Sequence, residues 1–308
     1  MEQAPSPRPG AAAPPSKLHG ALLTLAGVLV LSTDSLLVRL IDGDALTIVF
    51  WRGLLMALGF WLVLAVQQRA APLRALLLPS RPTLLAAVLF AGSTLCFVGA
   101  IKHAPVADVL LILAVIPLTG ALLSWLFLGE RVARVTWLAM LGAMLGLALV
   151  VGGQDRTGLD ADWRALAPLR GHALALGVTL FIGGYFTVLR SGRVGNPLPA
   201  LCIAGLLCAL VAAILTPRLD LPVDSWPQML LLGLVVMPVS FGLISLGPRS
   251  LPAAEVGLIM LLEAVFGGAL AWIFLYEPPA ASAALGGAVV ILSVGLRALA
   301  LRRADRPA

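Results

Sequence analysis

One stretch of the sequence occurs twice, and this repeat constrains the fold more than any other feature. Residues 251–277, LPAAEVGLIMLLEAVFGGALAWIFLYE, align without a gap with residues 104–130, APVADVLLILAVIPLTGALLSWLFLGE, at an offset of 147. The register pairs Pro105 with Pro252, Asp108 with Glu255, Gly120 with Gly267, Trp125 with Trp272 and Glu130 with Glu277. Self-similarity at a fixed offset indicates copies of one structural unit. We therefore expect two related halves.

The chain is far more apolar than a soluble domain. Of its 308 residues, 60% are hydrophobic and only 12% are charged, and the mean hydropathy is +1.02. A soluble domain carries about 25% charged residues. About 20 apolar residues cross a bilayer as one helix, and the apolar runs here are continuous rather than alternating. The sequence therefore predicts an all-α integral membrane protein whose surroundings are the lipid bilayer.

Composition also argues against several function classes. The formal net charge of +6 comes without a basic cluster, so we do not expect nucleic-acid binding. The three cysteines lie in apolar runs, which is typical of core residues. The three histidines are scattered, and no phosphate-binding loop or dinucleotide pattern is present. We expect neither an enzyme nor a metal or cofactor site.

The apolar runs define ten transmembrane helices. They are predicted at 18–38, 45–66, 83–102, 105–128, 132–151, 171–191, 197–216, 227–247, 252–275 and 280–300. The spans form two five-helix repeats, 18–151 and 171–300, joined by a polar linker at 152–170. Residues 1–17, rich in Pro and Ala, are expected to be disordered, and 301–308 form a basic tail.

The distribution of Lys and Arg predicts the orientation, because cytoplasmic loops carry the excess of basic residues. With the N-terminus inside, fourteen of the 21 basic residues fall on the inner side and six on the outer side. Both termini are then cytoplasmic and the linker 152–170 is periplasmic. Because five is odd, the second repeat enters from the opposite side. Inverted repeats of this kind suit alternating access around a site near the bilayer midplane.

The paired stretches resemble the EamA-type family of the drug/metabolite transporter superfamily. The resemblance rests on Ile116-Pro117-Leu118 followed by 124–130, SWLFLGE, and on Leu262-Glu263 followed by 271–277, AWIFLYE. It implies a multi-pass carrier of the bacterial inner membrane, often an exporter of amino acids, metabolites or toxic compounds. It also implies a central cavity between spans of both halves. The family's usual Glu-Pro is replaced here by Glu263-Ala264, so no proline is available to kink the ninth span.

Two acids and one arginine within the spans are the main candidates for substrate binding or coupling. Glu263 lies mid-span, where an ionised carboxylate is costly unless it faces a cavity or a partner. It suits proton coupling or cation contact, or a structural hydrogen bond. Asp34 suits a cationic or amino-group substrate, or pairing with Arg39. Arg52 needs a carboxylate or carbonyl partner; Asp34 across the first hairpin is one candidate, and a substrate carboxylate is the other.

Further candidates are weaker. The serine pair Ser93 and Ser240 shares the repeat register, and Tyr185, Phe97 and Phe241 either line an aromatic cavity or pack in the core. A second group suits structural or gating roles near the span ends: Asp108, Glu255, Glu130, Glu277, Trp125 and Trp272. Acids near a helix start favour its positive end, which is the simpler interpretation of Asp108 and Glu255.

The leading interpretation is a secondary active transporter of small metabolites, chiefly an exporter of amino acids or related metabolites and drugs, with proton coupling left open. Uptake or facilitated diffusion by the same fold is one alternative. A polytopic membrane enzyme or sensor is another, although the inverted repeat and the lack of catalytic clusters both favour transport.

Gly142 and Gly146 permit close helix packing, either within the chain or in a homodimer.

Overall fold

The computed structural model describes residues 17–67, 76–103, 109, 112–152, 166–216, 218–275 and 281–304. All regular secondary structure in these ranges is helical. The first half contains α1 (Lys17–Leu31), α2 (Asp34–Leu40), α3 (Ala45–Gln67), α5 (Arg81–His103), α7 (Ile116–Leu128) and α8 (Arg134–Gly152). The second half contains α9 (Leu166–Arg190), α10 (Leu198–Leu215), η2 (Val223–Ser225), α11 (Trp226–Leu230), the π-helical segment η3 (Leu231–Val236), α12 (Met237–Ile244), η4 (Gly247–Arg249), α13 (Ala253–Met260), α14 (Leu262–Leu275) and α15 (Ala281–Ala304).

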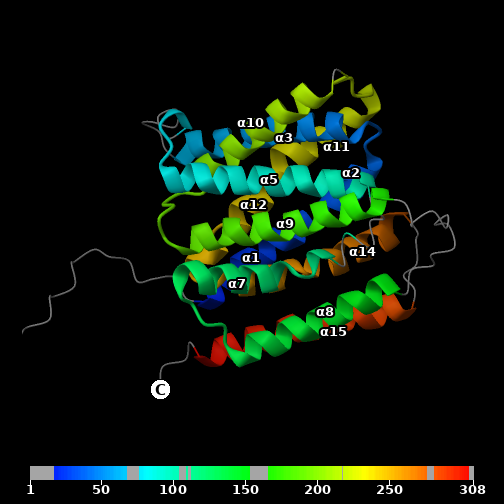
Figure 1. Cartoon of the computed structure of the whole chain (residues 1–308). Helices are drawn as coiled ribbons and strands as arrows, with labels where there is room; N and C mark the ends of the chain where they lie inside the picture. Colours follow the sequence, from blue (N-terminus) through cyan, green and yellow to red (C-terminus); the bar gives the residue numbers. More distant parts are fainter. Residues whose placement is uncertain are drawn as a thin grey trace, which may run out of the picture.

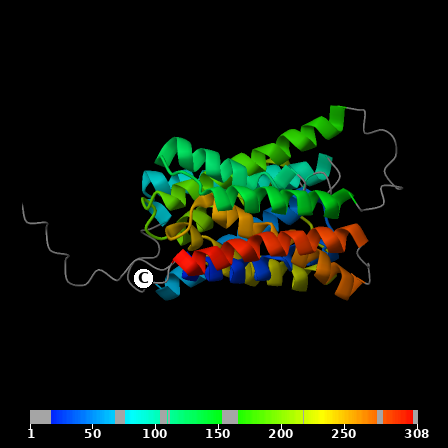
Figure 2. The same ribbon diagram turned by 90° about the horizontal axis from the view of Figure 1, so that it is seen from below.

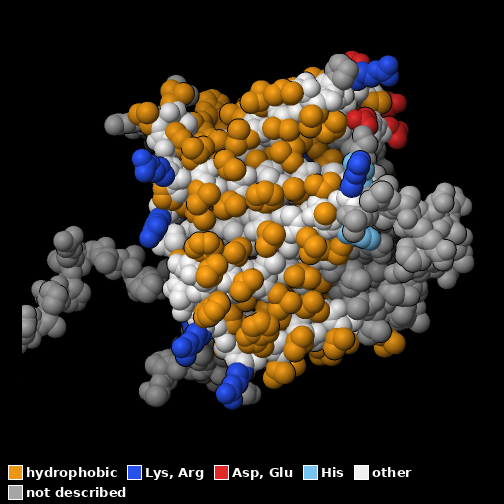
Figure 3. Space-filling view, in the orientation of Figure 1, with side chains coloured by type: hydrophobic (Ala, Val, Ile, Leu, Met, Phe, Trp, Pro, Cys, Tyr) orange, Lys and Arg blue, Asp and Glu red, His pale blue; other side chains and the backbone are white. Residues whose placement is uncertain are grey.

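The helices form a bundle with an apolar flank. Among the described residues, six segments are long and apolar enough to cross a membrane, and three shorter apolar helices accompany them. Figure 3 shows one flank covered by hydrophobic side chains, with Lys and Arg gathered at its left edge. We call that edge the basic end. The chain turns there after α7 and after α9 (Figure 1), and the arginines next to these turns are Arg131, Arg134, Arg190 and Arg193, with Arg249 bonded to the carbonyl of Gly195. α1 begins and α15 ends at this same end of the bundle (Figures 1 and 2).

The three predicted spans 18–38, 105–128 and 252–275 are interrupted rather than continuous. The first is interrupted at Ser32 and Thr33, whose hydroxyls donate to the carbonyls of Val28 and Val30, both at 2.8 Å. Side-chain bonds of this kind compete with the helical ladder. The fourth span has a turn at residues 114–115, just before Pro117 in the first turn of α7. Proline lacks an amide donor and therefore favours a helix start.

The ninth span is interrupted as well, at Leu261 between α13 and α14, although no proline is present there. This corrects the expectation drawn from the Glu263-Ala264 sequence. The amide of Leu261 donates to the carbonyl of Leu258 at 3.3 Å, a tighter pattern than the α-helical one. The interruption lies 147 residues after the turn at Ala114, so both repeats break at one equivalent position.

The two halves interdigitate through close helix pairs. α3 packs on α10, α5 on α9, and α8 on α15 (Figure 1). A Cβ atom on Gly53 would lie 2.7 Å from the carbonyl oxygen of Gly205, and one on Gly146 would lie 2.6 Å from that of Gly286. Small residues let helix backbones approach in a membrane. The row containing Gly142 and Gly146 thus packs against α15 within the chain.

Candidate functional site

A buried ion pair joins the start of α2 to α3. Nη2 of Arg52 lies 2.9 Å from Oδ2 of Asp34, and both side chains are largely buried. This pairing, one of the two interpretations of Arg52 drawn from the sequence, is therefore confirmed. The same guanidinium nitrogen contacts Sδ of Met237 on α12 at 3.1 Å. The pair thus connects the first half of the chain with the second.

The Asp34 carboxylate keeps one oxygen unused. Its Oδ1 atom is buried and has no hydrogen-bond partner among the described residues. Asp34 follows directly on the turn at Ser32 and Thr33, so the interruption between α1 and α2 places this carboxylate inside the bundle. An unpaired buried acceptor costs free energy unless water or a ligand satisfies it. This oxygen can therefore accept a hydrogen bond from a further donor.

Glu263 supplies a second acid from the other half. It stands in the first turn of α14, directly after the interruption at Leu261, and is half-buried. It lies within electrostatic range of both Asp34 and Arg52, and α14 contacts α1 and α2. Among the described residues it forms neither a hydrogen bond nor an ion pair. Its repeat mate Ile116 is a buried apolar residue at the matching interruption.

Together these three residues form what we call the charge cluster: Asp34, Arg52 and Glu263. One guanidinium lies within electrostatic range of two carboxylates, so the cluster lacks one positive charge when both acids are ionised. An unbalanced charge in a membrane interior is expensive. A proton, a monovalent cation or an amino group would supply the missing charge.

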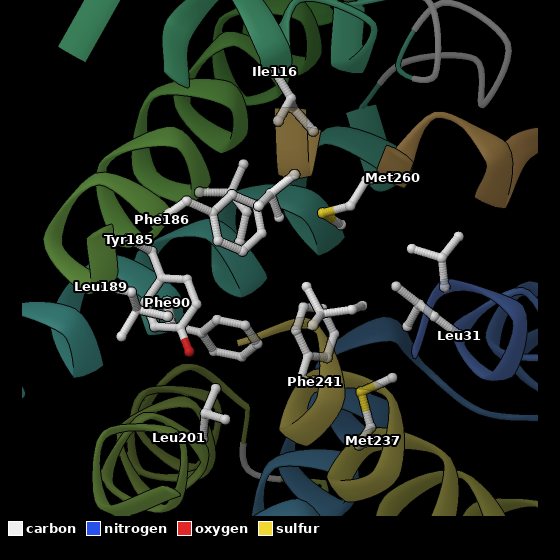
Figure 4. Packing of buried hydrophobic residues seen from close by; sticks show 14 of the residues in the cluster. Leu31, Phe90, Ile116, Tyr185, Phe186, Leu189, Leu201, Met237, Phe241 and Met260 are labelled. Carbon is white, nitrogen blue, oxygen red and sulfur yellow. The ribbon is translucent and has the colours of Figure 1, made fainter. Parts of the chain in front are cut away.

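Aromatic side chains pack near Met237, the residue that Arg52 contacts (Figure 4). The ring of Phe241 meets that of Phe90 edge to face at 4.7 Å, and Phe90 meets Tyr185 at 5.1 Å. The Tyr185 hydroxyl is buried and hydrogen bonds with Oγ of Ser245 at 2.7 Å. Tyr185 and Phe241 therefore belong to a packed aromatic core, while Phe97 on α5 is half-buried. Of the aromatic candidates, Phe97 keeps the most exposed ring.

The two paired serines use their hydroxyls within their own helices. Oγ of Ser93 donates to the Phe90 carbonyl at 2.8 Å, and Oγ of Ser240 donates to the Met237 carbonyl at 3.2 Å. Both side chains are buried. The lone pairs of both hydroxyl oxygens remain available. Ser93 and Ser240 can therefore accept a hydrogen bond but have already donated their own.

Of the candidates near the span ends, Glu130 and Glu255 form ion pairs, Trp125 is exposed, and the others lack a described side chain. Oε1 of Glu130 accepts from Nε of Arg190 at 2.8 Å. Oε1 of Glu255 accepts from Arg297 in a buried pair that ties α13 to α15. Trp125 is exposed on the flank of α7. Asp108 and Glu277, together with the side chain of Trp272, lie outside what the structure describes.

Arg190 and Arg297 are the residues that sequence reasoning missed, because both were counted only among the basic residues of the cytoplasmic side. Nη1 of Arg190 also reaches the carbonyls of Pro248 and Arg249, at 3.5 and 3.4 Å. It thereby ties the end of α9 to Glu130 and to η4. In the sequence, each of these arginines directly continues an apolar run. This pattern could have indicated that they lie on the transmembrane helices themselves.

Comparison with known proteins agrees with this architecture. The model of the EamA-like transporter family matches residues 17–152 and 169–298, one match for each half. A crystal structure of a protein without a stated function is similar with a TM-score of 0.78, although only 18% of residues are identical. The alignment covers 93% of this chain and 99% of that one, so the fold extends over both proteins. The chain belongs to the EamA-like transporter family, and it is a multi-pass transmembrane transporter of the drug/metabolite transporter superfamily.

Proposed function

We propose that the protein is a secondary active transporter that exports small metabolites carrying an amino group, and that it exchanges them for protons at Glu263. The observation that carries this proposal is the charge cluster, in which Glu263 adds an acid to an Asp34–Arg52 pair whose charges already balance. The cluster joins residues of both halves, as expected for a site between two repeats.

The proposal includes ten membrane spans arranged as inverted repeats. α8 leads away from the basic end, whereas its repeat mate α15 leads back to it (Figure 1), which supports opposite orientations of the two halves. The basic end would face the cytoplasm of a bacterial inner membrane, because basic residues concentrate on that side. Two such halves can exchange inward-open and outward-open conformations, which is alternating access.

Charge balance suggests how substrate and proton are coupled. A single positive charge neutralises Glu263, so a proton and an amino group compete for it. Binding of one favours release of the other, since two positive charges would overcompensate the cluster in a medium of low dielectric constant. Competition at one carboxylate is a sufficient basis for exchange. Oδ1 of Asp34 would accept a hydrogen bond from the same amino group.

An apolar groove that is lined in part by Thr33, the residue before Asp34, suggests that the substrate also has a hydrophobic part. It has a volume of about 560 Å³ and is lined by Leu29, Val30, Thr33, Leu36, Leu37, Leu231, Val236, Leu270 and Phe274. Leu270 and Phe274 follow Glu263 by seven and eleven residues, which places all three on one face of α14. An apolar amino acid or an amphiphilic amine would fit this arrangement.

Transport by the Glu263→Gln variant tests the proposal. Purified protein in proteoliposomes would be assayed with amino acids, amines and amphiphilic drugs, with and without a pH gradient. We expect the variant to lose gradient-driven transport while keeping more of its substrate exchange without a gradient, because the amide preserves shape and cannot carry the proton. Asp224→Asn, which changes an exposed acid in η2, is the matched control.

The result also separates the alternatives. Normal gradient-driven transport by a well-folded Glu263→Gln protein would contradict proton exchange at this residue. Equal accumulation with and without the gradient in the unmodified protein would favour facilitated diffusion. Accumulation driven in the direction of the proton flow would favour uptake.

A further inference from the structure

A second groove opens on the flank of the molecule between α7 and α8, close to the basic end. Its volume is about 510 Å³, and it is lined by Leu118, Ala121, Leu122, Trp125, Glu130, Arg131, Val132 and Trp137. The α7 members, Leu118, Ala121, Leu122 and Trp125, follow the pattern i, i+3, i+4, i+7 and therefore form one face of that helix. Leu122 and Trp125 on this face are 54% and 57% exposed, so no other described helix covers them.

The second half of the molecule provides an internal comparison, because its equivalent helices are packed together. A Cβ atom on Gly287 of α15 would lie 3.2 Å from the side chain of Val265 on α14. Val265 is the repeat mate of Leu118, which lines the groove. The position of α8 that matches Gly287 carries Met140, which is buried. The groove therefore lies at the position where the second half has a contact between α14 and α15.

The polar end of the groove is positively charged. Glu130 is neutralised by Arg190, at 2.8 Å. Arg131 lines the groove and is exposed, and Arg134 is exposed at the start of α8. Neither joins the ion pairs found among the described residues. Trp125 and Trp137 flank this end, and tryptophan is enriched at the level of lipid head groups.

We propose that this groove is a binding site for one anionic phospholipid of the leaflet at the basic end. An acyl chain would lie along the apolar face of α7, and the phosphate would be held by Arg131. A ligand with a long apolar part and one anionic end matches both the lining and the charge. Basic pockets between transmembrane helices commonly recognise such head groups. The lipid would supply the contact to α7 that α15 supplies to α14.

Native mass spectrometry of the purified full-length protein tests this site. The protein would be mixed with equal amounts of phosphatidylglycerol and phosphatidylcholine, and the retained lipids counted. We expect preferential retention of one phosphatidylglycerol. Arg131→Gln should weaken that preference roughly fivefold, which corresponds to about 1 kcal/mol for one basic residue near an anionic head group. Arg193→Gln, which changes an exposed arginine at the same end but outside the groove, should retain the lipid like the unmodified protein.

A second variant tests the apolar part of the groove. Leu122→Trp places a larger side chain on an exposed position of α7, so it should fill the groove and displace the lipid while leaving the melting temperature without added lipid unchanged. Equal retention of both lipids by the unmodified protein would overturn the proposal. So would unchanged phosphatidylglycerol retention by Arg131→Gln. The Arg131 result decides alone if the tryptophan variant fails to fold.

Discussion

Individual charged residues illustrate how this membrane protein tolerates ions in its interior. Asp34 and Arg52 are buried together and joined at 2.9 Å, and Glu255 is buried with Arg297. Moving a charge out of water is costly, and a partner offsets that cost only when the geometry is good. Glu263 differs from these acids because the described residues give it no direct partner. Glu263 is therefore available to bind a proton or a substrate, whereas Asp34 and Glu255 hold helices together through their ion pairs.

Breaking the Asp34–Arg52 pair is expected to destabilise the protein. Arg52→Met leaves the Asp34 carboxylate buried without its cation, and removing one partner of a buried pair costs about 3–5 kcal/mol. The double variant Arg52→Met with Asp34→Asn removes both charges and should recover most of that loss. Thermal unfolding of the purified variants in detergent measures the difference. A single variant as stable as the unmodified protein would mean that water or another group compensates Asp34.

At the scale of the elements, helices pack in pairs, and glycines determine how closely the two helices of a pair approach. Gly53 and Gly205 bring α3 and α10 into backbone contact, since a Cβ atom on either would lie 2.7 or 2.6 Å from the carbonyl oxygen of the other. Interruptions are the other feature at this scale. Those at Ser32-Thr33 and at Leu261 direct the first turns of α2 and α14, and thereby Asp34 and Glu263, into the bundle.

Gly53→Ala should therefore destabilise the bundle. The added methyl group would overlap the α10 backbone, and overpacking of a close contact typically costs about 1–3 kcal/mol. Gly295→Ala is the matched control, because a Cβ atom at Gly295 on α15 would meet nothing within 4 Å. The melting temperature should fall for the first variant and stay constant or rise for the second. Equal melting temperatures would indicate that α3 and α10 can separate without loss.

At the scale of the whole molecule, two repeats interlock so that each half completes the other. α3 packs on α10 and α8 on α15, and each of these pairs takes one helix from each half. The charge cluster likewise draws Asp34 and Arg52 from the first half and Glu263 from the second. A movement of one half relative to the other would therefore alter both the helix packing and the charge cluster.

Reporter fusions test the proposed orientation of this assembly. A reporter active only in the cytoplasm would be fused after Ala308, and in a second protein after Gly158. We expect activity from the first and none from the second, because the excess of basic residues keeps the basic end inside. Activity of the second fusion with silence of the first would reverse the orientation. Fusions that retain transport of the substrate provide the control for correct insertion.

The sequence by itself determined that the protein is helical, membrane-embedded and internally duplicated. Apolar runs near 20 residues dictate transmembrane helices, since lipid offers no partners to an open backbone. The repeat at an offset of 147 likewise predicted two related halves, and the helix interruptions at Ala114 and Leu261 lie at that offset. Pairing of Arg52 with Asp34 was predictable as one of two candidates, because a buried arginine needs an acceptor.

Only the tertiary structure decided which polar groups meet. Arg190 and Arg297 follow apolar runs near span ends, a pattern equally typical of solvated charges, and distant segments had to be placed before their acid partners became evident. The interruption at Leu261 contains no proline, so a proline pattern could not have predicted it. Lipid-facing and buried apolar positions also have the same composition, because membrane helices are hydrophobic on every side. The sequence therefore could not separate the exposed face of Trp125 from the packed core around Tyr185, which depends on contacts between helices.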